Sequence, residues 1–112
     1  MRLDEITARQ GTLEYAVERM REGYGGRPSK ICYNYAGRVL RHNAEALEAE
    51  RAEVVFYAMP RLGIIHVAVV TPEQRFEDNI SPDLDLSQAE EQRYPVAEVL
   101  GWLQGRDEPP TF

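Results

Sequence analysis

The feature that most constrains the fold is a pair of apolar stretches, at 53–59 and 64–70, separated by a short turn from Pro60 to Gly63. β-Branched and aromatic residues fill both stretches, which is typical of strands. The second stretch is apolar on both faces, so we expect it to be central in its sheet. A second short turn at 71–74 leads to a third strand at 75–80. Connections this short favour an antiparallel meander, because parallel strands need crossovers of about a dozen residues or more.

Two helices are predicted before the sheet. The first begins after a Thr12 cap and carries an apolar stripe with a period of 3.6 residues. Glycines and Pro28 end it and form a loop. The second helix runs from about Ile31 to Leu47 after a Ser29 cap. Its expected inward face comprises Cys32, Ala36, Val39, Leu40, Asn43 and Leu47.

A final amphipathic helix is predicted from Pro95, which suits a first helical turn, with Trp102 beside its apolar face. The fold class is therefore α+β: N-terminal helices packed on an antiparallel sheet of three or more strands, closed by a C-terminal helix. With 43% apolar and 29% charged residues among 112, the chain has the composition of one globular domain rather than of a disordered segment. We place this domain at 1–105 and a flexible tail at 106–112.

Charge and cysteine content narrow the function classes. A net charge of −6 argues against nonspecific nucleic-acid binding, which needs clustered Lys and Arg. No apolar stretch approaches the roughly 18 residues needed to span a bilayer, and the first residues lack a secretory signal, so we expect no membrane partner. A single cysteine suits a reducing, cytoplasmic compartment.

The strongest functional hint is the order of three side chains, Cys32, His66 and Asp78. A thiol in a first helical turn has its pKa lowered by the helix dipole, and a nearby imidazole favours the thiolate further. By strand alternation His66 shares a face with Ile64, and Asp78 can lie beside His66 across an antiparallel pair. Asp78 would then fix the imidazole tautomer; Asn79 takes that role if a bulge shifts the register.

Each of these residues also has a structural interpretation. A lone cysteine on a helix is usually a small buried hydrophobe, and a histidine in an apolar strand is more often a satisfied core residue. The Asp78-Asn79 step could simply begin a turn. Metal chemistry is not expected, since cysteines and histidines at paired spacing are absent from the sequence and Cys32 lies ten residues from His42, about 15 Å along a helix. We expect no cofactor.

Three short segments resemble the bacterial transglutaminase-like cysteine peptidases of the papain-like superfamily: CYNYA at 32–36, HVAVV at 66–70 and FEDNI at 76–80. The resemblance implies a Cys-His-Asp triad of Cys32, His66 and Asp78 acting at an amide bond. Tyr33, Asn34 and Asn79 are then the expected substrate contacts, although Asn34 stands where an Asp is common in the family.

The first interpretation of function is a small cysteine peptidase, amidase or acyltransferase acting on a protein or peptide, for example a phage or effector protein acting on a host component. The alternative is an acidic, non-catalytic inhibitor or adaptor that binds a host protein through its negative surface. A third is a papain-like scaffold that keeps the site residues without turnover. The sequence leaves the substrate and the oligomeric state open.

Overall fold

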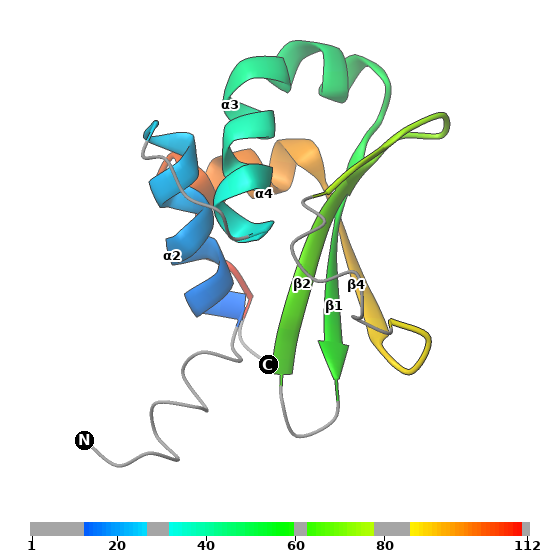
Figure 1. The fold of residues 1–112 in the computed structure, drawn as a ribbon. Helices are drawn as coiled ribbons and strands as arrows, with labels where there is room; N and C mark the ends of the chain where they lie inside the picture. The colour runs from blue at the N-terminus through cyan, green and yellow to red at the C-terminus, as the bar shows by residue number, and fades with distance from the viewer. Residues whose placement is uncertain (1–12, 27–31, 60–62, 78–85, 111–112) are drawn as a thin grey trace, which may run out of the picture.

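The computed structural model describes residues 13–26, 32–59, 63–77 and 86–110. These form helices α2 (Leu13–Tyr24) and α3 (Cys32–Ala49), strands β1 (Glu53–Met59), β2 (Gly63–Val70), β3 (Arg75–Phe76) and β4 (Glu90–Pro95), and helix α4 (Val96–Leu103). The sheet has the order β3-β2-β1-β4, and every neighbouring pair is antiparallel. The three helices gather on one side of the sheet (Figure 1). The predicted α+β class is therefore confirmed.

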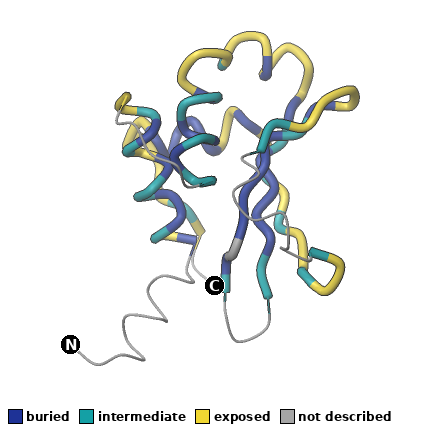
Figure 2. The backbone as a smooth tube through the Cα atoms, viewed as in Figure 1, coloured by how far each residue is buried: buried dark blue, intermediate teal, exposed yellow. Residues whose placement is uncertain are grey.

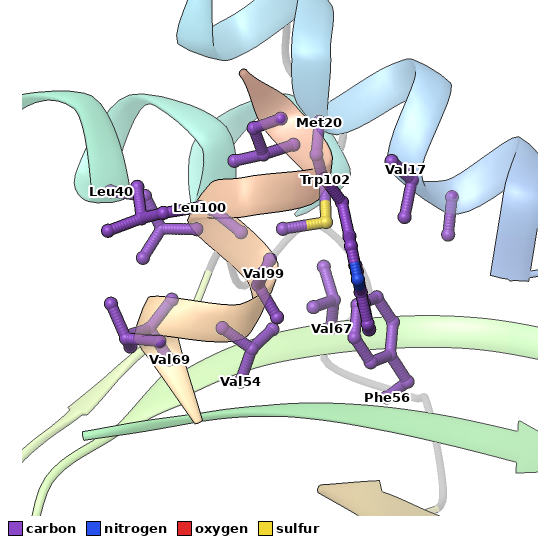
Figure 3. Close-up of a cluster of buried hydrophobic side chains, with 14 of the residues drawn as sticks. Val17, Met20, Leu40, Val54, Phe56, Val67, Val69, Val99, Leu100 and Trp102 are labelled. Atoms are coloured by element: carbon purple, nitrogen blue, oxygen red, sulfur yellow. The ribbon is translucent and has the colours of Figure 1, made fainter. Parts of the chain in front are cut away.

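The helices and the sheet enclose one large apolar cluster, here called the helix-side core (Figure 3). Phe56 and Trp102 are its largest side chains, and both are almost completely buried. The ring of Tyr94 joins them by edge-to-face contacts, with centroids 5.9 Å from Phe56 and 4.9 Å from Trp102. Strand β1 contributes Val54 and strand β2 contributes Val67 from the same face of the sheet. This face holds most of the buried apolar area, which makes it the principal source of stability.

The backbones of helices α2 and α3 are in contact at two glycines, Gly23 of α2 and Gly37 of α3. A Cβ atom on Gly37 would lie 2.0 Å from the Met20 carbonyl oxygen, and one on Gly23 would lie 1.9 Å from that of Asn34. Only glycine fits either position, because any side chain would force the helices apart. The guanidinium of Arg21 then ties α2 to α4 by donating two hydrogen bonds to the Trp102 carbonyl, at 2.8 and 3.1 Å.

A β-bulge in β2 corrects one predicted side-chain direction. Tyr57 pairs with His66, but the next residue of β1, Ala58, pairs with Ile64, so residue 65 is extra in β2. An extra residue reverses the alternation of side chains on one side of it. Ile64 consequently packs in the helix-side core, whereas His66 shares the opposite face with Tyr57. The expectation that Ile64 and His66 share a face was wrong.

Three other features of the fold differ from the sequence prediction. Strand β4 was missed, because its six residues carry mostly charged and polar side chains. Asn43 is exposed rather than inward, since α3 kinks there (φ −129°, ψ 18°) and its side chain bonds back to the Val39 carbonyl at 3.0 Å. Among the described residues the third strand is short, Arg75–Phe76. The caps predicted at Thr12 and Ser29 lie outside the described residues.

The C-terminal helix starts one residue later than predicted, with Pro95 as its N-cap. Beyond it, the backbone N–H groups of Arg106 and Asp107 donate to the Gly101 carbonyl, at 2.9 and 3.2 Å. The first residues of the predicted tail thus bond to the end of α4. Within the described ranges, no helix combines the length and apolarity that crossing a membrane requires.

Candidate functional site

Cys32 is the first residue of α3, as the sequence predicted for the nucleophile. It is half-buried and packs against the helix-side core. The next residue fastens this helical turn to the sheet, because the Tyr33 hydroxyl donates a hydrogen bond of 3.0 Å to the Ile64 carbonyl. Burial raises the pKa of Tyr33 above its ordinary value, and the neighbouring Cys32 acts in the same direction. The hydroxyl predicted to contact substrate is therefore a neutral donor committed to strand β2.

Asn34, also predicted to contact substrate, is buried. Its side chain is 1% exposed and lies in the contact between α2 and α3. The amide nitrogen of Asn34 donates to the Glu22 carboxylate at 3.4 Å. The close approach of the two helices at Gly23 buries this residue, so it belongs to the helix interface rather than to an open surface.

His66 lies on the face of the sheet that points away from the helices, here called the second face. Its partner Tyr57 belongs to a separate small cluster with Val55 and Ala68. Cross-strand partners share a face, and the two rings are 5.7 Å apart between centroids. The imidazole is nearly buried, with 7% exposure. Its position follows from the alternation of β2, in which the flanking Val67 packs in the helix-side core.

The carboxylate that contacts His66 is Glu77. Its Oε2 atom lies 2.8 Å from His66 Nε2, and its Oε1 atom accepts a hydrogen bond of 2.8 Å from Arg75 Nε. Arg75 also donates to the Tyr57 hydroxyl and stacks over that ring at 5.2 Å. These four side chains form a connected group, here called the second-face network: Tyr57, His66, Arg75 and Glu77.

The second-face network sets the charge of Glu77 and the position of the ring hydrogen on His66. The hydrogen bond from Arg75 holds the pKa of Glu77 below its ordinary value; the bond with His66 acts in the same direction, although partial burial opposes both. Glu77 is therefore ionised at neutral pH, and an ionised carboxylate can only accept. His66 Nε2 consequently carries the hydrogen of this bond. Such an oriented imidazole could act as a base through Nδ1.

Of the predicted triad, the described residues include Cys32 and His66, and these two lie on opposite sides of the sheet. Cys32 packs on the helix side of the sheet, whereas the His66 side chain projects from the second face. Asp78 and Asn79 lie outside the described residues. The prediction assumed that His66 faces α3; strand alternation sets Val67 there instead, and the imidazole faces Glu77.

The direction of the Glu77 side chain could have been predicted from the neighbouring Phe76. Phe76 is apolar and packs against the helix-side core, so its two neighbours must face the other way, with His66. The prediction that Asp78 lies beside His66 passed over Glu77. Within the described ranges, no group of three or more acidic, histidine or cysteine side chains could hold a metal ion.

No family model, no curated protein and no solved structure matches the chain. The resemblance to transglutaminase-like peptidases thus depends on the three short segments at 32–36, 66–70 and 76–80 alone.

Proposed function

We propose that this domain is a non-catalytic binding protein, an inhibitor or adaptor, which engages a basic protein surface through the far half of α3. This acidic arm comprises the residues from the kink at Asn43 to Glu50. Three carboxylates lie exposed on it: Glu45, Glu48 and Glu50. The arm arches over the end of the sheet and is exposed for most of its length (Figure 2).

The observation that carries this proposal is the mismatch between these charges and the helix that bears them. A helix C-terminus is the negative end of the macrodipole and favours cations, yet the last turn of α3 has no basic residue. Glu45 and Glu48 are also spaced so that like charges repel. Each such carboxylate costs up to about 0.3–1 kcal/mol. Residues that oppose local stability are expected where function requires them.

The arm is also held to the body at few points. Leu47 is the buried residue that anchors it, and the Ala52 carbonyl accepts a hydrogen bond from Val96 just beyond it, at 3.1 Å. Apart from Asn43, the remaining positions of the arm are alanine or glutamate, so a partner would meet carboxylates on a narrow, convex helix. Such a surface suits electrostatic capture of clustered Lys and Arg rather than a buried apolar interface.

Substitution of the three carboxylates tests the proposal. A triple Glu45→Gln, Glu48→Gln, Glu50→Gln variant is compared with a triple of the same charge change at the exposed Glu14, Glu73 and Glu108. With a lysine-rich helical peptide as the probe, we expect the arm triple to weaken binding at least tenfold and the control triple to weaken it far less. The arm triple should also unfold at a higher urea concentration than wild type. Equal loss of binding in both triples would show attraction by net charge only and contradict the proposal.

A second candidate is the cysteine hydrolase or acyltransferase of the sequence analysis. Two observations favour it: the Tyr33–Ile64 hydrogen bond holds the turn bearing Cys32 against β2 two residues before His66, and His66 is already bonded to a carboxylate. In this reaction the Cys32 thiolate would attack an amide carbonyl and His66 would protonate the leaving amine, with Glu77 or Asp78 orienting the ring. His66 would first have to reach the helix side, which a one-residue change in the register of β2 would allow.

For either candidate we propose a reducing, cytoplasmic setting, because the chain has a single cysteine. The partner in both is a protein or peptide rather than a nucleic acid, since the arm and the whole chain are acidic.

A further inference from the structure

Strand β4 lies at one edge of the sheet (Figure 1), and among the described residues it pairs only with β1. An edge strand presents backbone N–H and C=O groups that can pair with a strand of another chain. The exposed side chains of β4 are those of Glu90, Glu91, Arg93 and Pro95. Their order along the strand therefore determines which partner strand fits this edge.

The hydrogen bonds to β1 show which backbone groups of β4 point outward. Just beyond the strand, the N–H group of Val96 donates to the Ala52 carbonyl at 3.1 Å, so these two residues form the hydrogen-bonded type of antiparallel pair. Pairs of this type recur at every second residue. The residues between them, Glu91, Arg93 and Pro95, direct their backbone groups away from β1. Pro95 suits this position because proline has no N–H group to leave unpaired.

Symmetry limits how two copies of β4 could pair at this edge. Antiparallel pairing of identical strands requires a two-fold axis perpendicular to the sheet, and this axis keeps every side chain on its own face. Opposed residues also share a face, so the axis must pass through a residue and not between two residues. An axis at Glu91 opposes two glutamates, and an axis at Arg93 opposes two arginines, which repel each other. An axis at Gln92 avoids both conflicts.

An axis at Gln92 opposes Glu91 of each copy to Arg93 of the other. Both residues direct their backbone groups outward, so each such pair would exchange two backbone hydrogen bonds. The two side chains are 43% and 44% exposed, and Arg93 Nη2 donates to Glu91 Oε2 of its own strand at 2.9 Å. Arginine has five N–H donors, so each guanidinium could bond both carboxylates. We propose that the chain forms a symmetric dimer by antiparallel pairing of two β4 strands, with Gln92 on the two-fold axis.

The charges on β4 select one register instead of blocking the edge. Charged side chains on an edge strand prevent pairing where like charges meet. Here the sign alternates between Glu91 and Arg93, so the strand is complementary to its own copy at one axis. Each copy carries a net charge of −6, and a single strand is a small interface, so the dimer is weak and transient. The inference does not depend on the acidic arm, which lies on α3.

Sedimentation velocity of the full chain from micromolar to millimolar concentration tests the proposal with charge swaps. Wild type should show a dimer that increases with concentration. Arg93→Glu and Glu91→Arg should each raise the dissociation constant at least tenfold, because all charges beside the axis then have one sign. The double variant reverses both signs and should dimerise as wild type does. Arg106→Glu, which makes the same charge change at an exposed residue outside β4, is the control for Arg93→Glu and should also dimerise.

The backbone part of the proposal is tested by amide hydrogen exchange. The amides of Glu91 and Arg93 should become protected as the concentration rises, whereas the Gln92 amide, which bonds to β1, should be protected throughout. Arg93→Pro removes one outward N–H group and should weaken the dimer at least fivefold more than Arg93→Gln, which keeps it. Thermal unfolding establishes that each variant is folded.

Four results would each overturn the proposal. They are a wild type that stays monomeric up to millimolar concentration, a dimer that Arg93→Glu leaves unchanged, a folded double variant that does not dimerise, and protection of the Glu91 and Arg93 amides at every concentration. The last result would mean that the chain itself covers this edge.

Discussion

The two faces of the sheet use neighbouring residues for opposite purposes. On β1, Phe56 packs with apolar partners in the helix-side core, while the next residue, Tyr57, joins a network of charged and polar groups. On β2 the same contrast separates Val67 from His66. Parity along a strand thus decides the chemistry available to a side chain. Cys32 and His66 follow each other along the chain in the order expected of a catalytic triad. Strand alternation nevertheless directs the His66 side chain to the face of the sheet away from Cys32.

The largest effect that distinguishes the faces is expected at the β1 pair. Phe56→Ala should lower the free energy of unfolding by about 3–5 kcal/mol, because it removes a fully buried aromatic ring and leaves a cavity. Tyr57→Phe, which deletes only the hydroxyl that accepts from Arg75, should lower it by about 1 kcal/mol. Urea unfolding at neutral pH measures both. Similar losses in the two variants would contradict the unequal roles of the faces.

The close packing of the helix side is tested at Gly37. Gly37→Ala would set a Cβ atom 2.0 Å from the Met20 carbonyl oxygen and 2.9 Å from the Tyr24 nitrogen. Overpacking of this kind should destabilise the protein by about 1–3 kcal/mol, measured as a fall in the thermal midpoint. Gly25→Ala is the matched control, since its nearest neighbour is 3.4 Å away. A Gly37→Ala protein as stable as the control would refute the close crossing of α2 and α3.

A smaller effect than that of Gly37→Ala is expected in the second-face network. Glu77→Gln should destabilise the protein by about 1–2 kcal/mol at pH 7, because it removes an ionised acceptor of two hydrogen bonds. The folded pKa of Glu77 is lowered, so wild type has this stability above the unfolded pKa and loses it as the pH falls through the folded pKa.

Urea unfolding at pH 7 and at pH 3 measures this loss. The difference in free energy of unfolding between wild type and Glu77→Gln should be smaller at pH 3 than at pH 7. Glu73→Gln, at an exposed turn residue, serves as the control and should follow wild type at both values. A constant difference between wild type and Glu77→Gln at all pH values would mean that the carboxylate charge does not stabilise the fold.

Much of the fold was predictable because burial leaves a periodic pattern. The stripe of Leu13, Val17 and Met20 marks α2, and the apolar stretches mark β1 and β2. Strand β4 left no such pattern, since its outward residues are charged and Tyr94 is its main apolar contact with the core. Pairing with β1 stabilises β4 as a strand, and the local sequence of β4 does not predict that tertiary contact.

The candidate site was predictable only in part. The helical start at Cys32 followed from the local pattern, and so did the strand position of His66. Which face His66 takes depends on the register of β2 relative to β1 and on one extra residue at position 65. A one-residue change of register moves a side chain from one face of the sheet to the other. The local sequence of β2 does not specify its register to within one residue.

The rate of Cys32 alkylation by iodoacetamide from pH 5 to pH 9, in wild type and in His66→Ala, shows whether the thiol and the imidazole form a pair. The Cys32 thiol and the His66 imidazole lie on opposite sides of the sheet, so we expect the same pH profile for both proteins. A profile in wild type that rises well below the ordinary thiol pKa of about 8.5, and returns to that value in His66→Ala, would contradict it. That result would establish an imidazole–thiolate pair and restore the hydrolase as the leading candidate.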